Sequence, residues 1–165
     1  MNLYILRHGL AGKHTATVLA RDRERPLTPK GVKKMKEIAR AMQAMDLELD
    51  HIWSSPYRRA RQTAEIVAEV YDQRVDLIDA LGAEASPKKF FEAFSKIRPR
   101  SGSLLLVGHE PFLSSLMSLL VCGSASSQFD LKKGGLCQLT VRTFQPRPRA
   151  QLDWLLTPKQ MMLMR

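Results

Sequence analysis

Residues 3–9 read Leu3-Tyr4-Ile5-Leu6-Arg7-His8-Gly9, and residues 104–111 read Leu104-Leu105-Leu106-Val107-Gly108-His109-Glu110-Pro111. Each stretch is a short apolar run that ends in a histidine. Continuous apolar runs bounded by turn residues are typical of strands buried on both faces of a parallel sheet. Because such sheets bind ligands at the carboxyl ends of their strands, we expect His8 and His109 to lie at one binding edge.

Helical and strand patterns alternate along the rest of the chain. Helices are predicted to begin at Thr28-Pro29, Ser55-Pro56, Ser86-Pro87 and Pro111, where a capping residue or a proline starts a helical pattern. Short strands are predicted at 2–7, 51–54, 75–78 and 103–107, and a loop at 10–26. Residues 137–143 and 152–156 alternate between apolar and polar, which predicts an antiparallel pair. We therefore expect a single domain over residues 1–165, an α/β three-layer sandwich whose mostly parallel central sheet has an antiparallel edge.

The composition limits the classes of partner. The formal net charge of +10 favours anionic ligands in general. Aromatic residues make up only 7% of the chain, and there is no zinc-finger spacing, so no nucleic acid partner is expected. No apolar stretch is long enough to span a bilayer and no secretory signal is evident, so we expect a cytoplasmic protein without a membrane partner. Cys122 and Cys137 lack metal-ligand spacing and are expected to be small buried thiols.

The residue types at the two strand ends favour phosphate chemistry. The guanidinium of Arg7 offers a planar fork of donors that matches two phosphate oxygens. An imidazole kept neutral beside that positive charge is able to attack phosphorus, which makes His8 a candidate nucleophile. Gly9 would let the chain turn sharply, so that Arg7 and His8 meet one ligand. His109 is a second donor, and the helix that follows it would add backbone N–H groups.

A third contributor is predicted in residues 54–63, which also follow a strand and open a helix. Arg59 is placed near the inner side of that helix together with Gln62 and Thr63, and it is the expected second phosphate clamp. Arg58 and Arg61 lean towards solvent and remain the alternatives.

Four stretches resemble the histidine phosphatase (phosphoglycerate mutase-like) superfamily, and within it the SixA-type phosphohistidine phosphatases. They are LRHG at 6–9, RPLTPKG at 25–31, SPYRRARQT at 55–63 and VGHEP at 107–111, in the family's order. The resemblance implies a phosphoglycerate mutase-like fold in which His8 is transiently phosphorylated. Arg7, Arg59 and His109 would then hold the phosphoryl oxygens, and a water would hydrolyse the phosphohistidine. No metal and no cofactor are implied.

The chain departs from its larger relatives around the leaving group. Glu84 falls where the resemblance places an acid that protonates a departing alkoxide, but the surrounding match is poor. Glu110 is an alternative through its proximity to His109. Leu10 and Ala11 replace the family's threonine and asparagine, and there is no long insertion that would form a lid. These departures favour an open site for a phosphoprotein, whose phosphorylated imidazole is an easier leaving group.

The expected function is metal-independent hydrolysis of protein phosphohistidine. One alternative is a phosphomonoesterase or mutase of the same superfamily that acts on a small phosphate ester. An alternative of another class is a basic module that binds nucleic acid or polyphosphate through a degenerate pocket, against which the intact Arg7, His8, Arg59 and His109 set argues. Lys132 and Lys133 are interpreted as a basic turn, with a place on the rim of the phosphate pocket as the second possibility.

Overall fold

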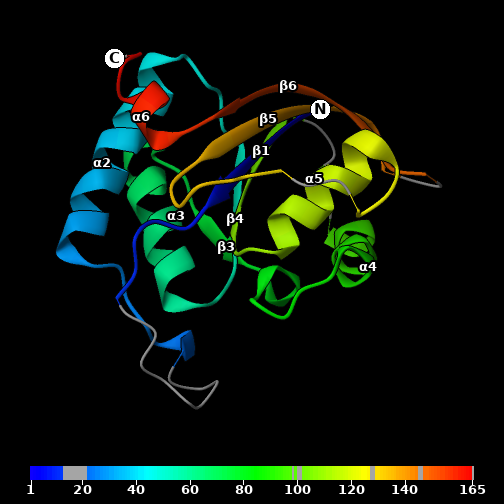
Figure 1. The fold of residues 1–165 in the computed structure, drawn as a ribbon, viewed down its shortest axis with the longest axis horizontal. Coiled ribbons are helices and arrows are strands. Elements are labelled where there is room, and N and C mark those ends of the chain that lie inside the picture. Colours follow the sequence, from blue (N-terminus) through cyan, green and yellow to red (C-terminus); the bar gives the residue numbers. More distant parts are fainter. Residues whose placement is uncertain (13–21, 98, 100–101, 127–128, 145–146, 165) are drawn as a thin grey trace.

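The computed structural model describes residues 1–12, 22–97, 99, 102–126, 129–144 and 147–164 (Figure 1). The strands are β1 (Asn2–Arg7), β2 (His51–Ser54), β3 (Val75–Leu77), β4 (Ser103–Gly108), β5 (Leu136–Thr143) and β6 (Arg149–Leu156). The helices are α2 (Pro29–Ala44), α3 (Arg58–Tyr71), α4 (Pro87–Ile97), α5 (Phe112–Cys122) and α6 (Pro158–Met161), with a 3-10 turn η1 at Asp79–Leu81.

The six strands form one sheet in the order β3-β2-β4-β1-β5-β6. The pairs β3/β2, β2/β4 and β4/β1 are parallel, whereas β1/β5 and β5/β6 are antiparallel. The predicted mostly parallel sheet with an antiparallel edge is therefore confirmed. The predicted apolar runs are its two central strands, which have neighbours on both sides.

Helices cover both faces of this sheet, as a three-layer sandwich requires (Figure 1). Alternate residues of a strand point to opposite faces. Tyr4 and Leu6 accordingly pack in the core beneath α2 and α3, whereas Leu3 and Ile5 pack in the core beneath α4 and α5. Because both faces are covered, every residue of β4 is buried, which explains its continuous apolar run.

Most predicted boundaries hold to within a few residues. The Thr28 hydroxyl accepts the Gly31 N–H at 3.0 Å and Pro29 follows it, so α2 begins as predicted. Helix α3 begins three residues after Ser55, because Tyr57 occupies the N-cap position. Most of the predicted loop at 10–26 lies outside the described residues, but the prediction was wrong at Asp22 and Arg23, which are helical, and Ala11 pairs with Leu27. The short helices η1 and α6 were not predicted.

The prediction for the two cysteines was half wrong. Cys137 is buried in β5, but Cys122 is exposed at the C-terminal end of α5. The last buried residue of α5 is Leu120, and Gly123 ends the helix in the left-handed conformation directly after Cys122.

Leu106→Ala tests the importance of the central strand. Leu106 is fully buried in β4, so its truncation should leave a cavity and lower the free energy of unfolding by about 2–5 kcal/mol. Chemical denaturation measures this change. Leu163→Ala is the matched control, since Leu163 is 78% exposed and its truncation should cost less than about 0.5 kcal/mol. Equal losses in the two variants would contradict the assignment of β4 to the core.

Candidate active site

The register of the sheet brings the two histidines together. Arg7 in β1 pairs with Gly108 in β4, so the residues that follow them leave the sheet side by side. The His8 N–H continues the ladder by donating to the carbonyl of Gly108 at 3.1 Å. The ring centroids of His8 and His109 are 5.0 Å apart. The expectation that both imidazoles reach one edge of the sheet is therefore confirmed.

His8 has a defined tautomer. Its Nδ1 lies 2.7 Å from the carbonyl oxygen of Gly9. A carbonyl oxygen only accepts, so Nδ1 carries the proton and the lone pair is on Nε2. That nitrogen faces Arg59, whose Nε donates to it at 3.3 Å. The residue is 6% exposed, so the Nε2 lone pair lies in a buried site beside a guanidinium group.

Arg59 is the arginine of its segment that enters the site. Its side chain is 4% exposed and donates from Nη1 to the Asp22 carbonyl at 2.8 Å and from Nη2 to the Asp22 carboxylate at 3.0 Å. Arg25 binds the same carboxylate at 2.9 Å, so Asp22 holds two guanidinium groups. Arg58 and Arg61 are exposed, and Arg61 pairs with Glu65 on the surface of α3.

Arg7 and His109 each leave one nitrogen for a ligand. Arg7 donates from Nη1 to the carbonyl of Leu131 at 2.9 Å, which anchors the guanidinium. The Nε2 of His109 is 2.8 Å from the Ser55 hydroxyl, and its ring packs 5.1 Å from that of Tyr57. Among the described residues, the buried Arg7 Nε and His109 Nδ1 have no hydrogen-bond partner. Buried polar atoms rarely stay unpaired, so both atoms are candidate contacts for a polar ligand.

Gly9 is required for packing at this position. Its N–H donates to the Thr63 hydroxyl at 3.0 Å, so this donor is already taken inside the protein. A Cβ at residue 9 would lie 2.6 Å from Cγ of Met35, which leaves no room for a side chain. Its φ is not positive. Glycine is therefore favoured here by the close approach of Met35 in α2, and the role of Gly9 in letting Arg7 and His8 meet one ligand stays a prediction.

Both imidazoles are kept neutral by their surroundings. Burial, with the charges of Arg59, Arg7 and Lys133, lowers the pKa of His8 to about 3, despite the opposing hydrogen bond to Gly9. Burial lowers the pKa of His109 to about 2, with His8 and the neighbouring arginines adding to the effect. A neutral imidazole keeps the lone pair that a nucleophile needs at physiological pH.

The two candidate acids lie in different surroundings. Glu84 is exposed and lines a cavity of about 340 Å³ together with Arg23, Tyr57 and Lys89, next to the ring that packs on His109. Glu110 is half-buried, and burial raises the pKa of its carboxyl group although the bonds from Ser114 oppose the shift.

Two of the backbone N–H groups at the start of α5 are already bonded within the protein. The Leu113 N–H donates to the carbonyl of His109 at 3.0 Å, and the Ser114 N–H donates to the Glu110 carboxylate at 3.3 Å. These amide groups are therefore satisfied within the chain, and the side chains of Arg7, Arg59 and His109 are left as the candidate anion ligands.

Sequence reasoning missed the residues that support the site. Asp22 contacts Arg59, and Ser55 and Tyr57 contact His109, and these contacts join segments far apart in the chain. One signal was present for Asp22, since an acid among the arginines of residues 21–25 is a natural ion-pair partner, but Glu24 shares that signal. Ser55 and Tyr57 lie in a quoted motif, yet its pattern does not identify what they touch.

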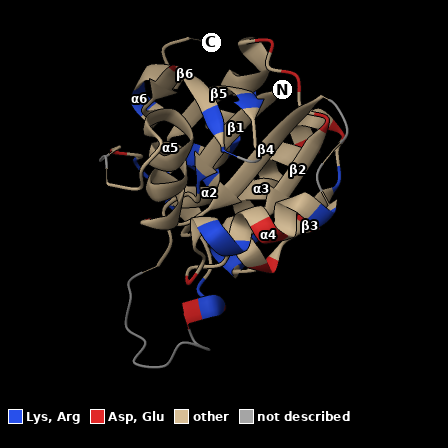
Figure 2. Cartoon of the chain, turned by 90° about the vertical axis from the view of Figure 1, so that its right-hand side faces the viewer, with Lys and Arg blue, Asp and Glu red and all other residues tan. Residues whose placement is uncertain are grey.

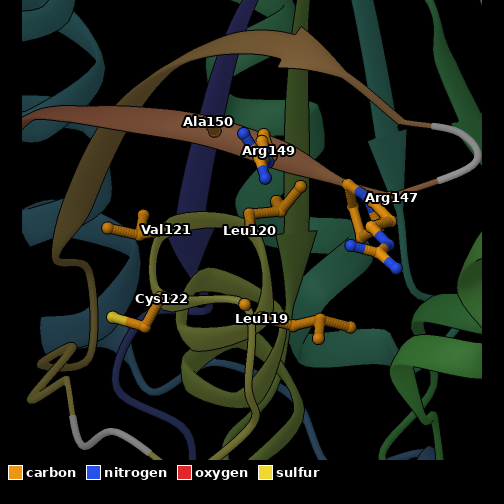
Figure 3. A pocket seen from close by; sticks show the side chains of 9 residues that line it. Leu119, Leu120, Val121, Cys122, Arg147, Arg149 and Ala150 are labelled. Atoms are coloured by element: carbon orange, nitrogen blue, oxygen red, sulfur yellow. The ribbon is translucent and has the colours of Figure 1, made fainter.

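His8 and His109 do not line the cavities found in the described part of the chain. One of about 710 Å³ lies between the C-terminal turn of α5 and the start of β6, where Arg147 and Arg149 stand over Leu119 and Leu120 (Figure 3). Since β6 begins opposite the end of β5, this cavity is at the other edge of the sheet. Figure 2 shows Lys and Arg on several elements, with both signs of charge on α4.

Two further searches covered the described residues only. No three or more His, Cys, Asp or Glu side chains gather there as they would to hold a metal ion. Within the same part of the chain, no helix combines the length and the apolar character needed to cross a bilayer.

Comparison with known proteins identifies relatives along the whole chain. Residues 3–86 match the model of the histidine phosphatase superfamily (branch 1). An uncharacterized protein of Picosynechococcus sp. is 33% identical over 99% of both chains. Phosphohistidine phosphatase SixA of Escherichia coli is 26% identical, over 78% of this chain and 80% of its own.

Solved structures share the fold. Protein histidine phosphatase SixA in complex with tungstate superposes with a TM-score of 0.79 at 22% identity, covering 96% of this chain and 98% of its own. An α-ribazole-5'-P phosphatase of Escherichia coli gives a TM-score of 0.73 at 18% identity, over 96% and 97%. A phosphoserine phosphatase of Entamoeba histolytica gives 0.69 at 18% identity, over 97% and 98%.

The buried neutral histidines should make the protein less stable in mild acid. Their folded-state pKa values, about 3 and about 2, lie below the ordinary 6.5. Between the folded-state and the unfolded-state pKa values, the histidines bind protons in the unfolded chain but not in the folded one. The contribution of the two neutral histidines to stability is therefore complete above pH 6.5 and declines as the pH falls. Each histidine should contribute up to about 1.4 kcal/mol per pH unit.

Denaturation curves between pH 7 and pH 4.5 measure this slope. His8→Asn and His109→Asn should each flatten it, whereas Glu110, with its raised pKa, acts in the opposite direction. Identical slopes in the wild type and in both variants would show that neither imidazole is held neutral by the fold.

Proposed function

Because this chain belongs to the histidine phosphatase superfamily (branch 1), we propose that it hydrolyses phosphorylated substrates through transient phosphorylation of His8. One observation carries the proposal: the lone pair of a buried neutral imidazole lies among Arg7, Arg59 and a second neutral imidazole. We further propose that residues 1–165 form a single domain of this family.

The first step transfers the phosphoryl group to His8. Nε2 attacks phosphorus and forms the P–N bond while the bond to the leaving group breaks, and the leaving atom takes that electron pair. The ring gains positive charge as its lone pair is used, and the Gly9 carbonyl stabilises that charge through the Nδ1 proton. Arg7, Arg59 and His109 donate to the phosphoryl oxygens, where charge builds up in the transition state.

The second step returns the enzyme to its starting state. A water attacks phosphorus from the side opposite His8, a P–O bond forms and the P–N bond breaks. The electron pair goes back to Nε2, and the proton lost by the water leaves with inorganic phosphate or to solvent. Asp22 keeps Arg59 in place through both steps, because it binds the outer nitrogens and leaves Nε directed at His8.

The substrate we propose is a phosphohistidine on a protein. The match to phosphohistidine phosphatase SixA supports this class. A departing imidazole needs less proton donation than an alkoxide, which suits a site whose candidate acid Glu84 is exposed at the rim. Lys133 acts electrostatically on His8 and would add to the attraction for a phosphorylated surface.

A small phosphate ester is the second candidate. Glu84 lines a cavity with Arg23 and Lys89 beside Tyr57, and this arrangement would let an acid reach a small leaving group. Relatives in fold include phosphatases for α-ribazole-5'-P and phosphoserine. The other class, a basic module that only binds nucleic acid or polyphosphate, would show salt-dependent binding without phosphate release.

His8→Ala tests the nucleophile. We expect kcat/KM to fall roughly 10⁴-fold or more, because no other described imidazole places a lone pair beside Arg59. Wild-type enzyme quenched during turnover of a ³²P-labelled substrate should carry an acid-labile label on His8, and mass spectrometry locates it. His51→Ala, at the far end of β2, is the matched control and should keep both activity and label. Unchanged turnover in His8→Ala would refute the mechanism.

The two acids distinguish the substrate classes. With a phosphohistidine peptide, Glu84→Gln and Glu110→Gln should leave kcat close to the wild-type value, since the leaving imidazole needs little help. If small phosphate esters are the physiological substrates, loss of the acid should lower kcat on 3-phosphoglycerate or an aryl phosphate by about 10²–10⁴-fold. Steady-state rates on the three substrates measure this. Ester turnover that is both faster and dependent on Glu84 would replace our substrate assignment with the second candidate.

A further inference from the structure

Ser55 connects the end of β2 to the second histidine. It is fully buried, and its N–H donates to the carbonyl of Val107 at 2.9 Å. Its carbonyl accepts the Ser54 hydroxyl at 3.0 Å. The bond to Val107 fixes the backbone of Ser55 against β4, at a position two residues before His109. The Ser55 hydroxyl therefore has a defined place beside the imidazole, 2.8 Å from Nε2.

The hydroxyl of Ser55 has one proton to give. Its oxygen already accepts the Tyr57 N–H at 3.2 Å, because a backbone N–H only donates. The remaining lone pair and the proton are left for His109. If the hydroxyl donates to Nε2, the ring proton is on Nδ1. If Nε2 donates to the hydroxyl, Nδ1 has only a lone pair.

The surroundings of Nδ1 decide between these two arrangements. Nδ1 of His109 is buried and has no hydrogen-bond partner among the described residues. A lone pair there would repel a phosphoryl oxygen, whereas an N–H would bind it. Burial also keeps this ring neutral, lowering its pKa to about 2, so it has a single ring proton whose position matters.

We propose that Ser55 is a positioning residue, whose hydroxyl donates to Nε2 of His109 and thereby holds the ring proton on Nδ1 as the donor to the phosphoryl group. The assignment of the proton and the role of that donor both rest on the proposed function, because both take Nδ1 to face a phosphoryl oxygen. The two histidines then share one tautomer and do opposite work. His8 offers the lone pair of Nε2 for attack, and His109 offers the N–H of Nδ1 for binding.

Nitrogen-15 NMR of histidine-labelled protein tests the tautomer directly. The chain has four histidines, which single substitutions assign. In the wild type at pH 7, we expect His109 to carry its proton on Nδ1. In Ser55→Ala the proton should move wholly or partly to Nε2, the form that neutral imidazoles prefer in water. Ser54→Ala removes a neighbouring buried hydroxyl that does not touch the ring, and it should keep the wild-type tautomer.

Binding and turnover measure the consequence. Partners that orient a histidine through its other nitrogen are worth about 10- to 100-fold at metal sites, and we expect a loss of this size in kcat/KM for Ser55→Ala. Affinity for tungstate, a tetrahedral oxyanion that is not turned over, should fall in the same variant. Ser55→Thr keeps a hydroxyl and should restore both the tautomer and a large part of the rate.

A proton on Nε2 in the wild type, or an unchanged tautomer in Ser55→Ala, would overturn the proposal. If Ser55→Ala does not fold, the wild-type spectrum decides alone. A wild-type protein with the proton on Nδ1 but without phosphatase activity would refute the proposed function and leave the hydrogen-bond assignment standing.

Discussion

The parallel pairing of β1 with β4 and of β4 with β2 sets the geometry on which the site depends. In this register Arg7 lies opposite Gly108 and Ser54 lies opposite Val107. The residues that follow each strand therefore leave the sheet at the same level. His8, His109 and Ser55 lie close together there because each directly follows the end of a strand. Strands buried on both faces are rigid, and a nucleophile held by them keeps its aim better than one held by a mobile segment.

Burial at this edge makes the chemistry possible and also costs stability. The two imidazoles are buried beside guanidinium groups and therefore resist protonation, so His8 keeps its lone pair at neutral pH. The same burial would leave Arg59 an isolated charge, and Asp22 offsets this with two contacts to its guanidinium. Although burial opposes it, the pKa of the Asp22 carboxyl is lowered by Arg59 and Arg25, so the pair stays ionised. The anion ligands are thus held in place before a substrate arrives.

The local sequence pattern was enough to predict the strands, the main helices and the position of the two histidines at strand ends, because an apolar run and its end consist of consecutive residues. Arg59 was predicted for the same reason, since helical periodicity separates it from Arg58 and Arg61. The contacts of Asp22 and Ser55 were not predicted, because their partners lie 37 and 54 residues away in the sequence and only the folded sheet brings them together. The packing constraint at Gly9 was not predicted, because the side chain that leaves no space for a Cβ is Met35, on a different element.

The catalytic core and the surroundings of the leaving group come from different kinds of structure. The core groups follow the ends of β1 and β4 and occupy the first turn of α3, where the sheet and its helices define their positions. Glu84 follows η1 and Lys133 lies between α5 and β5, both outside regular elements, and Arg23 lies in a short helical segment before α2. Segments of this kind change between relatives more readily than buried strands do. Phosphoryl transfer to a histidine requires the same nucleophile and the same anion ligands for every leaving group. The acid that protonates the leaving group, in contrast, has to suit each substrate. A fixed core with an adjustable rim is therefore the arrangement that lets one fold serve relatives with different phosphorylated substrates.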